Sequence, residues 1–346
     1  MTRPRLRALV LAAGRGERLR PLTDTVPKPL LPIAGDAVAA HTLERLQRAG
    51  CEAAALNLYH LGDAIRARFG GDFAGMPLEY SPEATLQGTL GALYPLREFL
   101  RQAEAVVIVN GDSHCRWPIE ALVRRHLRSG AQATLLLVKR APADELRGGG
   151  VAVDRAGRAA GFRGAILPGV PESELRRRVF GGAHVLAPGL LERVPEGPGD
   201  IISGLYQALL AEGGTIATVT TGRAWHDLGK PRRYLEAALA SGLRWGPLGR
   251  ARVAPQAQIE AGARLRRAVV EGDARIERGS LVERSLVLPG AVIGAGSRLC
   301  DTIVGFGAIV PPGTSVERRL VTPRGPQPPP AQATVVGNLV FTLLDG

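Results

Sequence analysis

Apolar and amphipathic segments alternate along the first 240 residues of the chain. Short runs of consecutive apolar residues, typical of strands buried on both faces, are separated by segments with apolar residues at helical spacing. This alternation predicts β-α-β crossovers and a Rossmann-like α/β domain with a mostly parallel sheet, which binds ligands at the carboxyl ends of its strands. Between residues 148 and 186, shorter alternating stretches indicate an inserted β layer. The strand-like runs cover residues 7–13, 53–59, 105–112 and 133–139, and the helix-like runs cover 39–50, 61–69, 90–100 and 119–130.

A different period begins after residue 250. Aliphatic residues recur at every sixth position, and the first residue of each group of three recurs after 17 residues, with Gly, Ala, Pro and Asp in the turns between. Three hexads per coil with one residue deleted predict a short left-handed parallel β-helix of four coils, with the aliphatic side chains inside. The twelve in-phase positions are Val253, Ile259, Leu265, Val270, Ile276, Val282, Val287, Ile293, Leu299, Val304, Val310 and Val316.

These patterns predict three parts in a chain of 346 residues, which is long enough for two compact units. The α/β domain is expected over 1–243, the β-helix over 250–318 and a Pro-rich tail over 319–346. The tail ends in the apolar stretch VVGNLVFTLL, which we expect to pack on a domain or a partner. The flat sides and open ends of the β-helix also favour packing, and we expect a homo-oligomer.

Charge, apolar content and cysteine number indicate which partners and which cell compartment to expect. The net charge of +12 is spread along the chain and aromatic residues make up 4%, so we expect no nucleic-acid partner. No stretch approaches the roughly 20 apolar residues of a membrane helix, so we expect no membrane contact. Three widely spaced cysteines indicate reduced thiols and a cytoplasmic protein.

The loop after the first predicted strand, LAAGRGERLRPLTDTVPKPLLPIAG, carries the first candidate chemistry. Gly14 and Gly16 allow a tight turn whose backbone N–H groups point into one concavity that can hold a polyphosphate. Arg18 adds a side chain that can bind phosphate with two hydrogen bonds. This loop therefore predicts a phosphate site.

Lys28 is the second cation of this loop. Only three of the chain's 44 Lys and Arg residues are lysines, so a lysine at this position is unusual for this sequence. The flanking Pro27 and Pro29 stiffen its backbone, and a compact ammonium suits contact with a phosphate that changes shape during a reaction. The alternative is a set of solvated cations on a surface turn, namely Arg15, Arg18, Arg20 and Lys28.

Four segments together resemble the sugar-1-phosphate nucleotidylyltransferases, the family that makes GDP-mannose, dTDP-glucose and UDP-sugars. LAAGRGERLRPLT with PKPLLPIAG resembles the signature loop, and EATLQGTLGAL resembles the segment that contacts base and ribose. VVIVNGD resembles the strand ending in Gly-Asp, and AWHDLGKPRRYLEA resembles the Trp-x-Asp-x-Gly-x-Pro-x-x-Tyr element. A hexapeptide solenoid is a common C-terminal partner in this family, so the resemblance covers nearly the whole chain.

The resemblance implies a Mg²⁺ site held by Asp112 and Asp227. Asp112 follows an apolar run and is expected at the carboxyl end of a buried strand. Two hard oxygen ligands, completed by phosphate oxygens and water, suit Mg²⁺. The alternatives are a helix cap for Asp112 and a turn residue for Asp227. The adjacent His114 and His226 have no partners at ligand spacing, so zinc is not expected.

The resemblance also implies binding residues for both substrates. This sequence departs from the family pattern in two places. FRGAILPG stands where Glu-Lys-Pro is usual, and Arg163 is the nearest replacement for the lysine. FGGAHVL lacks the usual Asn. Glu83 could equally be an exposed loop residue. The expected nucleotide-binding residues are Leu11, Ala12, Ala13, Gly14, Arg15, Gly16, Gly88, Thr89 and Gly111, and the expected sugar-binding residues are Glu83, Gly150, Arg163 and Gly182.

The implied reaction is in-line attack of a sugar 1-phosphate on the α-phosphorus of a nucleoside triphosphate, with release of pyrophosphate. Arg18, Lys28, Asp112 and Asp227 are the expected catalytic residues. GTP with mannose 1-phosphate is the preferred pair. The alternatives are thymidylyl or uridylyl transfer to glucose 1-phosphate, or transfer to a muramic or heptose 1-phosphate.

Two hypotheses come from other classes of protein. The missing Glu-Lys-Pro motivates a regulatory subunit that binds a nucleotide-sugar without turnover. An acyl-transferring β-helix usually needs a histidine base, and all six histidines lie at or before His226. The sequence therefore disfavours the acyltransferase and keeps the regulatory subunit as an alternative.

Overall fold

The computed structural model describes residues 3–139, 146, 148–241, 244–246 and 249–345. The chain divides into two compact units. The first unit contains the residues up to Gly14 and Ala39–Trp225, and the second contains Arg15–Val38 and the residues from His226 onward. This division differs from the predicted domains, because it groups the signature loop with the β-helix; the predicted boundary at 243 lies outside the described residues.

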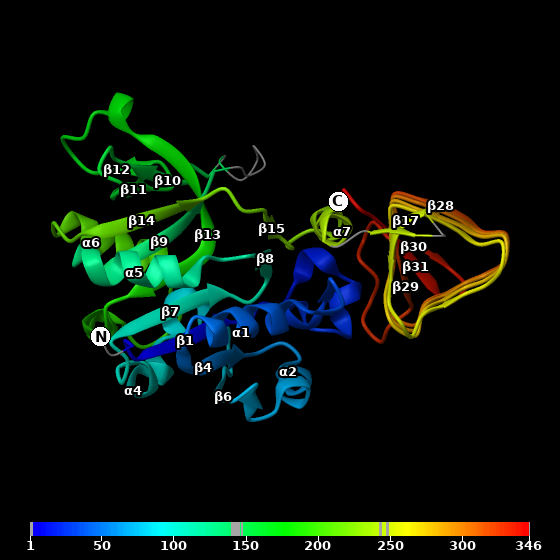
Figure 1. Cartoon of the computed structure of the whole chain (residues 1–346), viewed down its shortest axis with the longest axis horizontal. Coiled ribbons are helices and arrows are strands. Elements are labelled where there is room, and N and C mark those ends of the chain that lie inside the picture. The colour runs from blue at the N-terminus through cyan, green and yellow to red at the C-terminus, as the bar shows by residue number, and fades with distance from the viewer. Residues whose placement is uncertain (1–2, 140–145, 147, 242–243, 247–248, 346) are drawn as a thin grey trace. The chain divides into compact units, whose positions relative to one another are not determined.

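A mixed sheet forms the centre of the first unit (Figure 1). β1 (Leu6–Leu11) has β4 (Cys51–Leu58) and β7 (Ala105–Asn110) as parallel neighbours. β13 (Arg176–Leu186) lies antiparallel to β7 and β9 and so interrupts the parallel order. The remaining strands of this block are β5 (Asp72–Phe73), β6 (Met76–Pro82), β9 (Ala133–Val138) and β14 (Ile216–Thr221), and β8 (Ser113–Cys115) lies outside it.

The predicted inserted β layer is present. β10 (Val151–Val153), β11 (Ala159–Phe162) and β12 (Ala165–Ile166) form antiparallel pairs, and β10 joins β13. Val151, Val153 and Phe162 are buried in the same hydrophobic cluster as the central strands. The long β13 therefore belongs to both the inserted layer and the central sheet.

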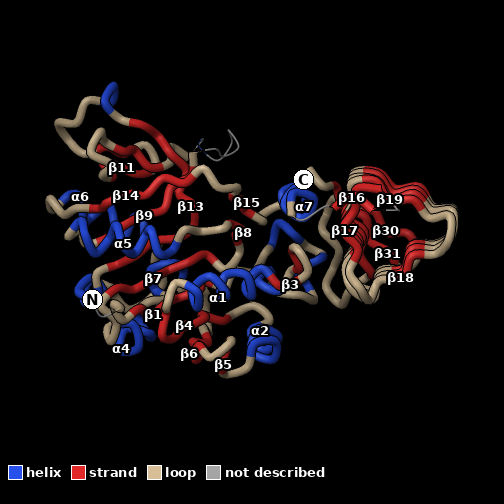
Figure 2. Tube along the Cα trace, in the orientation of Figure 1, coloured by secondary structure: helices blue, strands red, loops and turns tan. Residues whose placement is uncertain are grey.

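Helices flank the sheet, as Figure 2 shows. α5 (Ile119–Ser129) packs on β9, β13 and β14, and its Ile119, Leu122 and Val123 are buried. The predicted helix over 90–100 is broken, because Pro95 lacks a backbone N–H and interrupts α-helical hydrogen bonding. The other helical segments between residues 38 and 211 are α1 (Val38–Arg48), α2 (Gly62–Phe69), α3 (Gly88–Gly91), η4 (Tyr94–Leu96), α4 (Arg97–Leu100), η6 (Glu172–Glu174), η7 (Pro188–Arg193), η8 (Ile202–Tyr206) and α6 (Gln207–Ala211).

The predicted parallel β-helix forms the larger part of the second unit, and its stacked coils are visible in Figure 1. Successive coils pair in parallel along three sheets, with registers such as Val270↔Val287 and Val287↔Val304. All twelve predicted aliphatic positions belong to its hydrophobic core or pack against it. Its strands are β17 (Gly249–Val253), β18 (Gln258–Ile259), β19 (Arg264–Arg266), β20 (Ala268–Val270), β21 (Arg275–Ile276), β22 (Leu281–Glu283), β23 (Leu286–Val287), β24 (Val292–Ile293), β25 (Arg298–Cys300), β26 (Ile303–Val304), β27 (Ile309–Val310), β28 (Ser315–Glu317) and β29 (Arg319–Pro323).

The tail continues the first of these sheets. β31 (Leu339–Leu343) pairs antiparallel with β29 and with β30 (Thr334–Val336). At the other edge of the sheet, β16 (Arg244–Gly246) pairs antiparallel with β17. The apolar end of the tail therefore packs on the β-helix itself.

A second hydrophobic cluster of this unit joins the signature loop to the outside of the β-helix. α7 (Pro231–Ala240) packs on β20 and β23, and Gly35 of the loop approaches Arg252 so closely that a Cβ there would collide with the guanidinium. Arg252 in turn lies 2.8 Å from the buried Glu271. The cluster contains Leu19, Leu22, Leu31, Ile33 and Val38 of the loop, Leu228, Tyr234, Leu235, Ala237 and Ala238 in or next to α7, and Val269, Leu286, Leu288, Ile303, Leu320 and Leu344 of the β-helix and tail.

Candidate active site

The signature loop is built from short 3₁₀ turns within the second unit. Gly16 has a left-handed backbone (φ 66°) that favours glycine, and it precedes η1 (Glu17–Leu19). The Thr23 hydroxyl donates to the Gly16 carbonyl at 2.8 Å and closes the turn. Arg18 is exposed, whereas Leu19 is fully buried in the cluster described above. The loop thus anchors its apolar residues and leaves Arg18 accessible. Its other 3₁₀ turns are η2 (Leu22–Asp24) and η3 (Lys28–Leu30), and it ends in the paired short strands β2 (Pro32–Ile33) and β3 (Asp36–Ala37).

Lys28 is buried, with 5% of its surface exposed. It begins the turn η3, and the flanking prolines are buried as well. Its Nζ lies 3.8 Å from Oδ1 of Asp227, whose side chain is 24% exposed. A buried ammonium is costly without a charged partner, and the Asp227 carboxylate provides that partner for Lys28.

Arg18 and Asp227 meet at Gly229. A Cβ on Gly229 would collide with the Arg18 guanidinium and lie 2.8 Å from Oδ2 of Asp227. The Gly229 N–H donates to Asp227 Oδ1 at 3.1 Å. The glycine of the Trp-x-Asp-x-Gly element therefore allows this close approach, a role that the sequence did not reveal.

His226, next to Asp227 in β15 (Trp225–Asp227), is half-buried. Burial lowers the pKa of its imidazole, so the ring is neutral at neutral pH. A neutral His226 adds no positive charge beside Lys28 and Arg18.

The first unit holds the second predicted carboxylate. Asp112 lies two residues after the end of β7, and the intervening Gly111 donates its N–H to the Leu11 carbonyl at 2.9 Å. A Cβ on Gly111 would lie 2.8 Å from that carbonyl oxygen, so only glycine allows the ends of β1 and β7 to approach this closely. Leu11 and Asp112 are thus placed at the carboxyl ends of adjacent parallel strands. Asp112 is half-buried, and Ser113 Oγ lies 3.4 Å from its Oδ1.

Glu83 is bound within the protein. Its Oε1 accepts a hydrogen bond from Asn57 Nδ2 at 2.8 Å, and its Oε2 accepts one from the Gln87 N–H at 2.9 Å. Asn57 Oδ1 in turn accepts the Ala12 N–H at 2.7 Å. Asn57, which the sequence analysis missed, and Glu83 therefore link the Leu11–Ala13 segment to the turn at residue 88.

The Gly-Thr-Leu-Gly turn is held against residues 197–201. Gly88 has a left-handed backbone (φ 69°), and a Cβ there would collide with the Gly199 carbonyl. The Gly199 carbonyl accepts the Leu90 N–H at 2.9 Å. Thr89 Oγ1 accepts the Ile201 N–H at 2.9 Å. The predicted nucleotide-binding turn is therefore fixed by its backbone and by the Thr89 side chain.

Apart from Glu83, the predicted sugar-side residues lie next to strands of the inserted layer or on β13. The Arg163 N–H donates to the Gly150 carbonyl at 2.9 Å, and Arg163 Nη2 lies 3.0 Å from Asp200 Oδ2. Burial by itself would raise the pKa of Asp200. Hydrogen bonds from Ser203 and Arg163 outweigh this effect, so the pKa of Asp200 lies below its ordinary value. A Cβ on Gly182 (φ 75°) would lie 3.3 Å from the Asn110 side chain at the end of β7. Asp200, the partner of Arg163, had no signal in the sequence.

The donor set suits a metal ion bound largely by substrate. Among the described residues, no three His, Cys, Asp or Glu side chains cluster as a metal cage. Mg²⁺ is commonly bound through one or two carboxylates together with substrate phosphates and water. Asp112 in the first unit and Asp227 in the second are each half-buried, and each carboxylate by itself is the kind of oxygen ligand that this mode uses.

Comparisons with known proteins cover both folds. A family model described as nucleotidyl transferase matches residues 7–242, and one described as GlmU-like, C-terminal hexapeptide matches 246–319. A mannose-1-phosphate guanylyltransferase of Mycobacterium tuberculosis is 30% identical over 305 residues, 80% of this chain and 83% of the relative. No helix among the described residues is long and apolar enough to cross a membrane.

Two further relatives differ in their named substrates. A mannose-1-phosphate guanylyltransferase catalytic subunit beta of Xenopus tropicalis is 29% identical over 235 residues, 66% of this chain and 63% of the relative. A UTP–glucose-1-phosphate uridylyltransferase of Synechocystis is 29% identical over 245 residues, 67% of this chain and 62% of the relative. The chain thus spans less than two thirds of the length of these two relatives.

Proposed function

This chain belongs to the nucleotidyl transferase family, and we propose that it transfers a nucleoside monophosphate from a nucleoside triphosphate to a sugar 1-phosphate, releasing pyrophosphate. The observation that carries the proposal is the convergence of Arg18, Lys28 and Asp227 in the second unit. Two cations beside a carboxylate suit a triphosphate, because they neutralise the charge that develops on the leaving pyrophosphate.

The residues would act by position and charge. The exposed Arg18 offers two N–H donors to the leaving phosphates, and the rigid Lys28 offers a point charge to the α-phosphate. Asp112 and Asp227 would hold Mg²⁺, which, when bound, supplies further charge neutralisation on the phosphate oxygens. The reaction requires no covalent protein nucleophile, because the sugar-phosphate oxygen attacks in line.

For the substrate pair we propose GTP and mannose 1-phosphate. The names of the Mycobacterium tuberculosis and Xenopus relatives support this pair, whereas the Synechocystis relative supports UTP and glucose 1-phosphate. A cytoplasmic location and a homo-oligomer also remain predictions.

Pyrophosphate release tests the function directly. The chain would be assayed with Mg²⁺ against a panel of GTP, UTP, dTTP and ATP, each with mannose 1-phosphate and glucose 1-phosphate. We expect release with at least one pair, and the fastest release with GTP and mannose 1-phosphate. Binding of a nucleotide-sugar without release from any pair would instead favour the regulatory subunit.

A further inference from the structure

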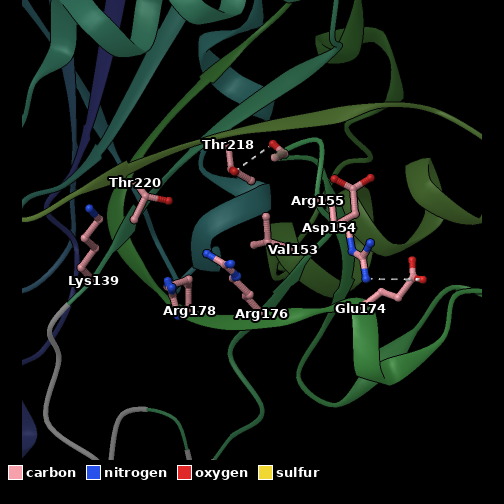
Figure 3. A pocket seen from close by; sticks show the side chains of 10 residues that line it. Lys139, Val153, Asp154, Arg155, Glu174, Arg176, Arg178, Thr218 and Thr220 are labelled. Atoms are coloured by element: carbon pink, nitrogen blue, oxygen red, sulfur yellow. Dashed lines mark hydrogen bonds and ion pairs between the residues drawn. The ribbon is translucent and has the colours of Figure 1, made fainter.

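A basic pocket of about 360 Å³ lies in the first unit, among strands β9, β10, β13 and β14 (Figure 3). None of its lining residues is among the predicted catalytic, nucleotide-binding or sugar-binding residues. The lining contains four cationic side chains, two carboxylates and two threonines, namely Lys139, Arg155, Arg176, Arg178, Asp154, Glu174, Thr218 and Thr220, with Val153 and Gly157.

The carboxylates of the pocket already have cationic partners. Glu174 Oε1 lies 3.8 Å from Arg155 Nη2, and this pair is drawn in Figure 3. Asp154 Oδ2 lies 2.9 Å from Nε of Arg158, which is not part of the lining, and Oδ1 accepts the Arg158 N–H at 2.8 Å. The negative charge of the pocket is therefore compensated.

Lys139, Arg176 and Arg178 remain as excess positive charge. Within the described part of the chain, the structure shows no ion pair for any of them; Arg178 Nη1 donates only to the Arg177 carbonyl, at 3.0 Å. Like charges brought together without anions repel one another. A negatively charged ligand would remove this repulsion.

All three cations lie on or directly after strands of the first unit. Arg176 and Arg178 are two residues apart on β13, so they share one face of the strand, and they pair with Val153 and Val151 of β10. Lys139 follows β9 directly, and its N–H donates to the Thr221 carbonyl at the end of β14 at 2.9 Å. The strands therefore fix the backbone positions from which the three side chains line one cavity.

We propose that this pocket binds a small molecule carrying two or more linked phosphoryl groups. Arginine pairs present two-pronged N–H donors that match phosphate oxygens, and three cations match the charge of a diphosphate better than that of a single carboxylate. The volume falls within the usual range for small-molecule sites. No aromatic side chain lines the pocket to stack on bases, so a strand of nucleic acid is a poorer fit.

Isothermal titration with pyrophosphate, without Mg²⁺ and at low salt, tests the proposal. The wild-type chain is expected to bind two equivalents, one at the signature loop and one in the pocket. The double variant Arg176→Gln/Arg178→Gln should lose one equivalent, or weaken it at least tenfold, while keeping its pyrophosphate-release activity. The control Arg124→Gln/Arg125→Gln, with two exposed arginines on α5, should bind like the wild type. Because the contacts are ionic, the pocket equivalent should weaken as salt rises.

A variant of the signature loop separates this proposal from the proposed function. Arg18→Gln should lose the loop equivalent and keep the pocket equivalent. If Arg176→Gln/Arg178→Gln binds both equivalents with wild-type affinity, or if the wild type binds only the equivalent that Arg18→Gln removes, the pocket proposal is overturned. If Arg18→Gln instead turns over normally, the proposed catalytic role of the signature loop is wrong. The comparison of wild type with Arg176→Gln/Arg178→Gln still tests whether the pocket binds phosphate.

Discussion

The Lys28 ammonium lies 3.8 Å from the Asp227 carboxylate, although the two residues come from opposite ends of the nucleotidyl transferase region. The contact gives a lysine with 5% of its surface exposed a carboxylate partner. It also places a cation beside one of the two proposed metal ligands. Substitution of Lys28 should therefore affect turnover more than folding, whereas substitution of Asp227 also leaves a buried ammonium without its partner and should lower stability as well.

Lys28→Met should lower turnover by about 10²–10³-fold, because it removes a fixed charge from the transferring phosphate while filling similar space. Pyrophosphate release at saturating substrates measures the effect, and thermal unfolding checks that the fold survives. Arg128→Met, at an exposed arginine of α5 outside every proposed site, is the matched control and should keep wild-type turnover. Near-normal turnover of Lys28→Met would remove Lys28 from the mechanism.

Asp112→Asn and Asp227→Asn should each abolish measurable turnover, because an amide is a weaker Mg²⁺ ligand than a carboxylate. Both variants should keep the wild-type circular dichroism spectrum. Raising Mg²⁺ should restore part of the activity, which an unrelated structural defect would not allow. Asp63→Asn on the exposed surface of α2 is the control. A wild-type rate in either site variant would contradict the metal assignment.

Gly229→Ala should impair the enzyme through Arg18. The added Cβ would displace the Arg18 guanidinium, so kcat/KM should fall by about as much as in Arg18→Ala. The double variant should then be little worse than either single variant, because both remove the same contact. Gly222→Ala, where a Cβ would meet no atom within 4 Å, provides the control. Additive losses in the double variant would show that Gly229 acts independently of Arg18.

Leu286 and Leu299 allow a test of the link between the β-helix and the signature loop. Leu286 faces the cluster that holds the loop, whereas Leu299 faces the interior of the β-helix, and both are buried. Truncation of either residue to Ala should destabilise the fold by about 2–5 kcal/mol. Only Leu286→Ala should also lower kcat/KM at temperatures where both variants are folded. Equal kinetic effects would argue against positioning of the loop by the β-helix.

His184 should make the fold sensitive to acid. Its ring is fully buried against the Tyr206 hydroxyl, and burial lowers its pKa to about 3. The unfolded chain binds a proton near pH 6.5 that the native state rejects, so stability should fall as pH drops from about 6.5 toward 3. His184→Asn should reduce this slope by up to about 1.4 kcal/mol per pH unit, measured by urea unfolding between pH 5 and 7. An unchanged slope would show that His184 does not carry this dependence.

The sequence by itself determined the elements whose signal is local. The 17-residue period identified the β-helix and twelve of its inward aliphatic positions, because each coil repeats the same geometry. Apolar runs located β1, β4, β7 and β9, because strands covered on both faces need continuous apolar residues. Lys28 between its two prolines and the Gly111-Asp112 pair after β7 could also be found from the sequence, because each is recognised from neighbouring residues alone.

Only the tertiary structure decided the contacts between distant segments. The antiparallel insertion of β13, the grouping of residues 15–38 with the β-helix and the approach of Arg18 to Gly229 depend on which surfaces pack together. The hydrogen bonds of Glu83 with Asn57 and of Arg163 with Asp200 likewise join residues far apart in the chain. Periodicity reports only whether a side chain is buried, and it carries no information about which distant side chain is its partner.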